Sequence, residues 1–251
     1  MAGTFRFSFG PWNIHEGADP FGPTVRGTVA FGEKLKLYKK LGFDGVQFHD
    51  DDAVPDLDEK SDGEMEKTAR EVRAMLDGEG LLAEFVAPRL WESPLGVDGG
   101  FTSNDPASRK WAVGRLKRTA TIANILGAEF IVLWLAREGT YIRESKNALD
   151  AHRHLLDAIN ELLEFDKKMQ IAIEPKPNEP MDHAYIPTIG HALAIASQTV
   201  DPKRVGGLIE TAHAILAGLD PSDEMAFALS MGKLWSVHLN DQNGLKFDQD
   251  K

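Results

Sequence analysis

Cysteine is absent from this sequence of 251 residues, so disulfide bonds and thiolate metal ligands are excluded. This absence is typical of a cytoplasmic protein. Long apolar runs are missing too: no stretch approaches the roughly 18 to 20 consecutive apolar residues of a membrane helix. The first residues also lack the apolar segment of a signal peptide. We therefore expect a cytoplasmic protein with no membrane partner.

Positive charge is in deficit, because the formal net charge is −11 at pH 7. No cluster of Lys and Arg is dense enough to bind a phosphate backbone, which argues against nucleic acid as a partner. The dinucleotide fingerprint GxGxxG does not follow any predicted strand. The acidic excess fits either simple solubility or a site where carboxylates gather around a hard cation.

Short apolar runs rich in β-forming residues alternate with longer stretches of helical periodicity. The predicted strands are 5–9, 45–49, 81–87, 129–134, 169–176, 205–210 and 234–240; the predicted helices are 30–41, 62–78, 106–127, 145–166, 190–200 and 221–231. Repeated β-α units of this kind favour a (β/α)8 TIM barrel over an open Rossmann sheet. We expect a single domain over residues 1–251, truncated after strand seven, with the eighth β/α unit absent from the given sequence.

Charged and polar side chains stand where the predicted strands end. In a TIM barrel these carboxyl ends form the mouth that carries the active site. Carboxylates and imidazoles at one mouth are typical of a divalent metal site. A salt bridge between Glu174 and Lys176 could instead close the barrel top, but charge at three other strand ends argues against it. The residues are His49 and Asp52; Glu174 and Lys176; Glu210 and His213; His238; and, further on, Asp248 and Asp250.

Several motifs, in order along the whole chain, resemble those of the xylose isomerase family. The run Glu-Pro-Lys-Pro-Asn-Glu-Pro, residues 174–180, is long and irregular, which argues against a chance match to the family. The motifs are 48–52, 173–180 and 242–250, together with Trp12, 19–22, 99–102, 104–105 and 137–139.

The resemblance implies roles in opening and holding a sugar. His49 would act near the ring oxygen, with Asp52 fixing its tautomer, and Lys176 would stabilise negative charge on the substrate oxygens near C1 and C2. For His49 the alternative is a histidine that merely caps a strand end.

Aromatic residues are implied in substrate binding. Trp12, Trp91 and Trp134 resemble the walls of the sugar pocket, although each could equally be ordinary barrel core. Phe21 resembles an aromatic residue that enters a neighbouring subunit's site, which implies a homodimer or homotetramer. A loop anchor is the alternative for Phe21.

The resemblance also implies two divalent cations per site, Mg²⁺, Mn²⁺ or Co²⁺, and no organic cofactor. Glu174 and Glu210 would bind the substrate-binding ion, and Glu210 would bridge to a second, catalytic ion. The other ligands of the second ion would be His213, Asp248 and Asp250. The implied reaction converts an aldose to a ketose by a hydride shift between C2 and C1 of the open-chain sugar.

The sequence departs from the family in four places. His238 stands where xylose isomerases have an aspartate ligand. As a metal ligand, its imidazole would suit Mn²⁺ or Co²⁺ better than Mg²⁺. Leu208 stands where an asparagine is usual. Arg89 lies in a run that replaces a Thr-Thr-Asn contact with substrate, so it could bind an acidic or phosphorylated sugar or turn outward to a surface carboxylate. Strand eight, with a further aspartate ligand, is missing.

Other functions remain open beside the isomerase. His238 and Arg89 favour another sugar isomerase or epimerase of the same superfamily, or His238 could be a strand-end histidine that faces solvent. A metal-binding barrel without catalysis would have no need of His49, Asp52 and Lys176. A glycosidase with Glu174 and Glu210 as its carboxylates would leave His213, Asp248 and Asp250 without a role. A DNA repair endonuclease should be basic.

Overall fold

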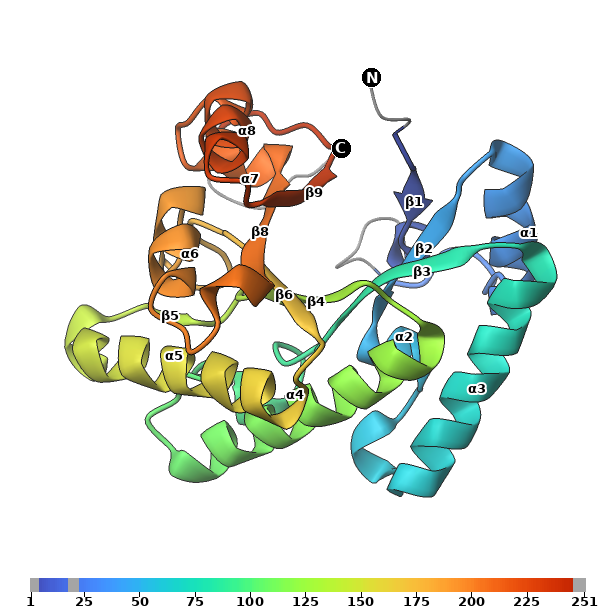
Figure 1. Cartoon of the computed structure of the whole chain (residues 1–251), viewed down its shortest axis with the longest axis horizontal. Coiled ribbons are helices and arrows are strands. Elements are labelled where there is room, and N and C mark those ends of the chain that lie inside the picture. The colour runs from blue at the N-terminus through green and yellow to red at the C-terminus, as the bar shows by residue number, and fades with distance from the viewer. Residues whose placement is uncertain (1–4, 18–22, 246–251) are drawn as a thin grey trace. The chain divides into compact units, whose positions relative to one another are not determined.

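Figure 1 shows the computed structural model of the chain, which describes residues 5–17 and 23–245. The chain divides into two compact units, Met1–Ala87 with Thr121–Phe130, and Pro88–Ala120 with Ile131–Lys251. Each unit contains parallel strands joined through helices, as the alternating sequence pattern predicts. The single domain stays a prediction. Among the described residues, no helix combines the length and the apolarity needed to span a membrane.

The first unit is built on three parallel strands. The middle one is β2, because Gly45 pairs with Ser8 on one side and with Leu82 on the other. Tyr38 and Phe48 are fully buried in its core. The elements are β1 (Ser8–Phe9), α1 (Phe31–Leu41), β2 (Gly45–His49), α2 (Asp50–Ala53), α3 (Asp62–Glu79) and β3 (Leu82–Ala87).

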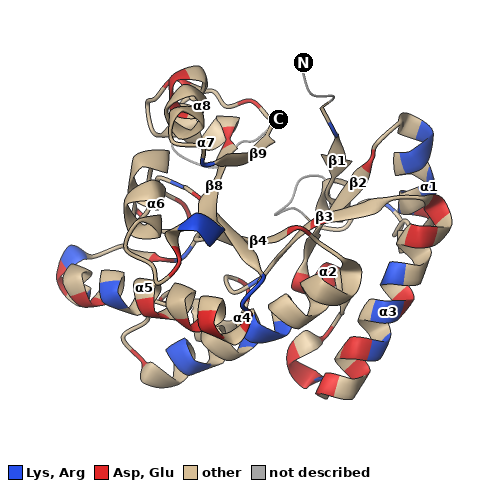
Figure 2. Cartoon of the chain, viewed as in Figure 1, with Lys and Arg blue, Asp and Glu red and all other residues tan. Residues whose placement is uncertain are grey.

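Helix α3 covers the apolar side of this unit with one face and meets solvent with the other. Met65, Ala69 and Leu76 are buried at helical spacing. Ser61 caps its first turn, and Gly80 ends it in the left-handed conformation at φ 64°. Acidic and basic residues are interspersed along the helix, as Figure 2 shows, so its exposed face carries no basic patch.

The second unit contains four strands in the order β4-β6-β8-β9 and a separate antiparallel pair, β5 with β7. Strand β6 runs parallel to β8, and β8 parallel to β9. The strands are β4 (Phe130–Trp134), β5 (Gly139–Thr140), β6 (Gln170–Glu174), β7 (His183–Ala184), β8 (Val205–Glu210) and β9 (Leu234–His238); the helices are α4 (Pro106–Leu126), α5 (Ala148–Phe165), α6 (Ile189–Ala196), α7 (Thr211–Leu216) and α8 (Pro221–Ser230). The end of α4, from Thr121, and the first residue of β4 are counted with the first unit.

Two strands end earlier than the sequence predicts, each for a local reason. Strand β6 ends at Glu174, because Pro175 and Pro177 have no backbone N–H to continue the ladder. Strand β9 ends at His238, because the Thr211 hydroxyl takes both backbone groups of Asn240, accepting from its N–H at 3.0 Å and donating to its carbonyl at 2.6 Å. Glu174 and His238 are therefore the last residues of their strands.

Candidate metal centre

Three of the predicted metal ligands meet in the second unit. Glu174, Glu210 and His238 are the last residues of the neighbouring strands β6, β8 and β9. Glu210 pairs with His238 across the ladder. One ligand atom from each side chain lies within 4.8 Å of the other two. The parallel arrangement produces this cluster, because it brings the carboxyl ends of consecutive strands to one edge.

The chemistry of these three side chains fits a divalent cation. Glu174 is 3% and Glu210 8% exposed, and two buried carboxylates this close repel one another unless positive charge compensates. His238 Nδ1 lies 3.2 Å from Glu210 Oε2 and 3.8 Å from Glu174 Oε1. Carboxylate oxygens with an imidazole nitrogen suit borderline ions such as Mn²⁺, Co²⁺ or Zn²⁺.

His213 joins this cluster from helix α7, which begins directly after Glu210. Its Nε2 lies 3.2 Å from Glu210 Oε1, and its Nδ1 lies 3.5 Å from Glu174 Oε1. Burial lowers the pKa of His213 to about 4, against the opposing effect of Glu210, so the imidazole is neutral at pH 7. Burial also acts to raise the pKa of Glu210, but His213 and His238 together hold it well below its usual range.

Asn240, which was not among the predicted site residues, orients Glu210. Its Nδ2 donates to Glu210 Oε1 at 2.7 Å, and its Oδ1 accepts the N–H of Ala212 at 2.9 Å. The amide therefore links the start of α7 to the carboxylate. The sequence signal is slight: an asparagine two residues past the end of a strand.

Replacing Asn240 by leucine is expected to weaken Mn²⁺ binding by about 10- to 100-fold, the usual cost of losing an outer partner of a ligand. Isothermal titration of metal-stripped protein measures the dissociation constant. The matched control is Asn147→Ala, because Asn147 caps α5 with the same kind of bond but touches no carboxylate of the cluster. An unchanged constant in the Asn240 variant would show that Glu210 does not need this amide.

Lys176 lies beside an aromatic pair. It is 2% exposed, and its Nζ stands 4.7 Å from the ring centroid of Trp134. Trp134 in turn meets Trp91 edge to face, with the ring centroids 4.3 Å apart. The structure thus brings together three residues that the sequence assigns to substrate contact, and their roles in binding stay predictions.

Arg89 contacts a carboxylate of its own segment. Its Nη1 lies 2.9 Å from Glu92 Oε1, and the Glu92 side chain is 61% exposed. Its guanidinium also lies 5.8 Å from the centroid of Trp91. The Arg89 side chain itself is only 16% exposed, so both alternatives, an outward-turned Arg89 and an acidic sugar as its ligand, stay predictions.

The first unit holds the remaining described candidates. His49 ends β2, and Asp52 follows in α2. Asp52 Oδ2 accepts the backbone N–H of His49 at 2.9 Å and lies 3.1 Å from its Nδ1. Trp12 packs on the imidazole, with the ring centroids 4.3 Å apart. A proton shared between Nδ1 and Asp52 would leave Nε2 as an acceptor; the catalytic roles of His49 and Asp52 stay predictions.

Three predicted residues lie outside the described part of the chain. They are Phe21, Asp248 and Asp250. The second metal ion and the contact between subunits, which depend on these residues, therefore stay predictions.

A family model described as xylose isomerase-like TIM barrel matches residues 35–250. The solved structures that share the fold include the following three. The IolI protein with a bound zinc atom is 15% identical, with a TM-score of 0.71 over 98% of this chain and 78% of that one. A D-psicose 3-epimerase with D-tagatose from Clostridium cellulolyticum H10 is 16% identical, with a TM-score of 0.68 over 94% and 73%. The 3-keto-D-glucoside 4-epimerase YcjR from E. coli is 18% identical, with a TM-score of 0.66 over 85% and 77%. The TIM-barrel prediction is confirmed.

Proposed function

Because the chain belongs to the xylose isomerase-like TIM barrel family, we propose that it is a metal-dependent enzyme that interconverts an aldose and a ketose. One observation carries this proposal: Glu174, Glu210 and His238 converge within 4.8 Å at the ends of adjacent strands. The motifs shared with xylose isomerases, above all the run from Glu174 to Pro180, support the finer assignment. The substrate would be a neutral pentose or hexose.

Glu174, Glu210 and His238 would hold the metal. A divalent cation supplies Lewis acidity there, polarising substrate oxygens and stabilising the negative charge that develops on them. Lys176 would donate hydrogen bonds from its ammonium group to the same oxygens, which adds a second positive charge. Trp91 and Trp134 would exclude water from the reacting carbons.

The reaction needs no external oxidant or reductant. The hydrogen on C2 of the open-chain aldose moves with its electron pair to C1, and the hydroxyl proton of O2 moves to O1. One carbon is oxidised as its neighbour is reduced, so aldehyde and alcohol become alcohol and ketone. Lys176 would stabilise the alkoxide character that both oxygens share during the transfer.

A second function, sugar epimerisation, is favoured by His238. The resemblance to xylose isomerases predicts an aspartate at this position, and this chain has an imidazole beside Glu210 instead. Two of the similar structures are named as epimerases. An epimerase removes a proton from a carbon next to a carbonyl and returns one to the opposite face, with a carboxylate as the base.

Turnover in D₂O separates the two functions. Metal-stripped protein is refilled with Mg²⁺, Mn²⁺ or Co²⁺ and given xylose, glucose, fructose or tagatose, and products are followed by NMR. We expect metal-dependent conversion of xylose or glucose to a ketose without carbon-bound deuterium, because a hydride shift does not exchange with solvent. Deuterium at an inverted carbon would favour the epimerase. Metal binding without turnover of these four sugars would contradict a neutral pentose or hexose as the substrate and move the search to acidic sugars that Arg89 could hold.

A further inference from the structure

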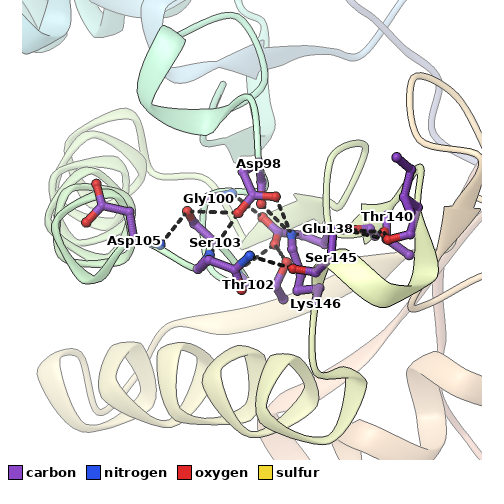
Figure 3. Close-up of polar contacts among 12 residues, drawn as sticks. Asp98, Gly100, Thr102, Ser103, Asp105, Glu138, Thr140, Ser145 and Lys146 are labelled. Atoms are coloured by element: carbon purple, nitrogen blue, oxygen red, sulfur yellow. Dashed lines mark hydrogen bonds and ion pairs between the residues drawn. The ribbon is translucent and has the colours of Figure 1, made fainter.

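Glu138 is a buried carboxylate that the proposed reaction does not use. It follows β4 and is 3% exposed. Its Oε1 accepts the N–H groups of Gly100 and Phe101 at 2.8 and 3.0 Å. Its Oε2 accepts the N–H and the hydroxyl of Thr102 at 2.8 and 2.6 Å. A single loop thus supplies hydrogen bonds to both oxygens of a buried charge (Figure 3).

The local sequence permits this close approach. Gly99 has φ +86°, and a Cβ there would lie 2.9 Å from Glu138 Oε2 and 2.7 Å from Thr102 Oγ1. A side chain at Gly99 would therefore displace either the carboxylate or the loop. Charge-assisted bonds to the backbone at these distances are stronger than neutral ones, so Glu138 fixes one conformation of the loop.

Two basic residues fix the same loop at other points. Arg137 Nε donates to the carbonyl of Trp91 at 2.7 Å. Lys146 is 7% exposed, and its Nζ contacts Asp98 Oδ1 at 3.0 Å and donates to the Gly139 carbonyl at 3.2 Å. Figure 3 shows Glu138 beside Gly100 and Thr102, and Lys146 beside Asp98. The residues after β4 therefore hold the loop from Trp91 to Thr102.

Two chains of contacts lead to Lys176, one from this loop and one from Glu138 itself. Through side chains, Trp91 packs on Trp134, and Trp134 lies under the Lys176 ammonium at 4.7 Å. Through the backbone, the Glu138 carbonyl accepts the N–H of Tyr185 at 2.9 Å, and the next residue, Ile186, accepts the N–H of Lys176 at 3.1 Å. Glu138 takes part in both: its side chain holds the loop, and its backbone carbonyl accepts the N–H of Tyr185.

We propose that Glu138 is a positioning residue: its carboxylate holds the Trp91 loop against Trp134 and thereby sets the position of the Lys176 ammonium. This proposal rests on the proposed function only where it concerns turnover. Burying a carboxylate is costly even when one loop donates four hydrogen bonds to it. In this proposal, the arrangement serves to set the position of the Lys176 ammonium.

The test combines a spectroscopic signal with kinetics. Two indoles in contact couple their transitions and give a paired positive and negative band in circular dichroism, which Trp91→Phe removes and so identifies. Glu138→Gln, which turns an acceptor oxygen into a donor facing Thr102, is expected to lose most of this band. We expect kcat to fall by about 10- to 100-fold, as for a catalytic group displaced by about 1 Å, with KM and Mn²⁺ affinity little changed.

Controls keep the outcome decisive. Glu144→Gln makes the same chemical change on an exposed carboxylate of the neighbouring segment and should alter nothing. If Glu138→Gln does not fold, Thr102→Val removes only the 2.6 Å bond and should weaken the band and kcat partly. An intact band in either folded variant overturns the proposal, even if the wild type turns over no sugar. A lost band with unchanged kcat overturns the link to Lys176.

Discussion

Metal-stripped Glu210→Gln protein is expected to bind Mn²⁺ more weakly than wild type by well over the roughly 10- to 100-fold that loss of an outer partner costs. Glutamine preserves the volume but removes the negative charge, and its amide hydrogens would face His213 or His238, which lie 3.2 Å from the carboxylate oxygens. The loss should appear in isothermal titration and also in thermal unfolding. Metal at 100 times its dissociation constant stabilises the wild type by about 2.7 kcal/mol, and the variant should lack this gain.

Glu161→Gln is the matched control for this experiment. Glu161 lies in the same unit, is about half exposed, and pairs with Lys117 at 2.6 Å. Its replacement should leave the metal affinity as it was. If Glu210→Gln bound Mn²⁺ like the wild type, the cluster of Glu174, Glu210 and His238 would not be the metal site.

Lys176→Met is expected to lower kcat by about 10²- to 10³-fold, the range found when one group that stabilises a developing oxyanion is removed. Methionine keeps most of the packing against Trp134 and removes the charge. Because Lys176 is not among the three proposed ligands, Mn²⁺ affinity should change far less than kcat. Steady-state rates of sugar conversion and metal titrations on the same preparation measure both quantities.

The chain contains a comparable lysine away from the cluster. Lys233 Nζ lies 5.9 Å from the ring centroid of Trp235 and donates to the carbonyl of Val205 at 2.7 Å. Lys233→Met removes the same kind of contact and should leave kcat near the wild-type value. Equal losses in the two variants would mean that Lys176 acts on stability and has no part in the reaction.

The sequence predicts the elements with strong local signals well. The bounds of β2 and β8, 45–49 and 205–210, agree with the structure residue by residue, because each apolar run ends in a charged or titratable side chain. The convergence of Glu174, Glu210 and His238 follows as well, since alternating strands and helices place consecutive strand ends at one edge.

Other features escape prediction because they are short or distant. Helices α2 and α7 have four and six residues, too few for a helical period to be recognised. The strand pair β5 and β7 has two residues on each side. The bonds from Gly100 to Glu138 and from Asn240 to Glu210 span 38 and 30 positions, and nothing in the intervening sequence fixes that separation. In the sequence, nothing distinguishes Glu138 or Asn240 from other glutamates and asparagines, because only the fold brings their partners close.

The pairing of β5 with β7 bears on how new specificities could be engineered into this chain. Gly139 pairs with Ala184 and Thr140 with His183, and a methyl group on Gly139 would lie 2.3 Å from the His183 carbonyl. The segments after β4 and β6 are therefore matched in length and shape at this point, and neither can be exchanged alone without breaking the match. A loop transplanted from a relative to follow β6 should travel with the residues that follow β4, as one cassette.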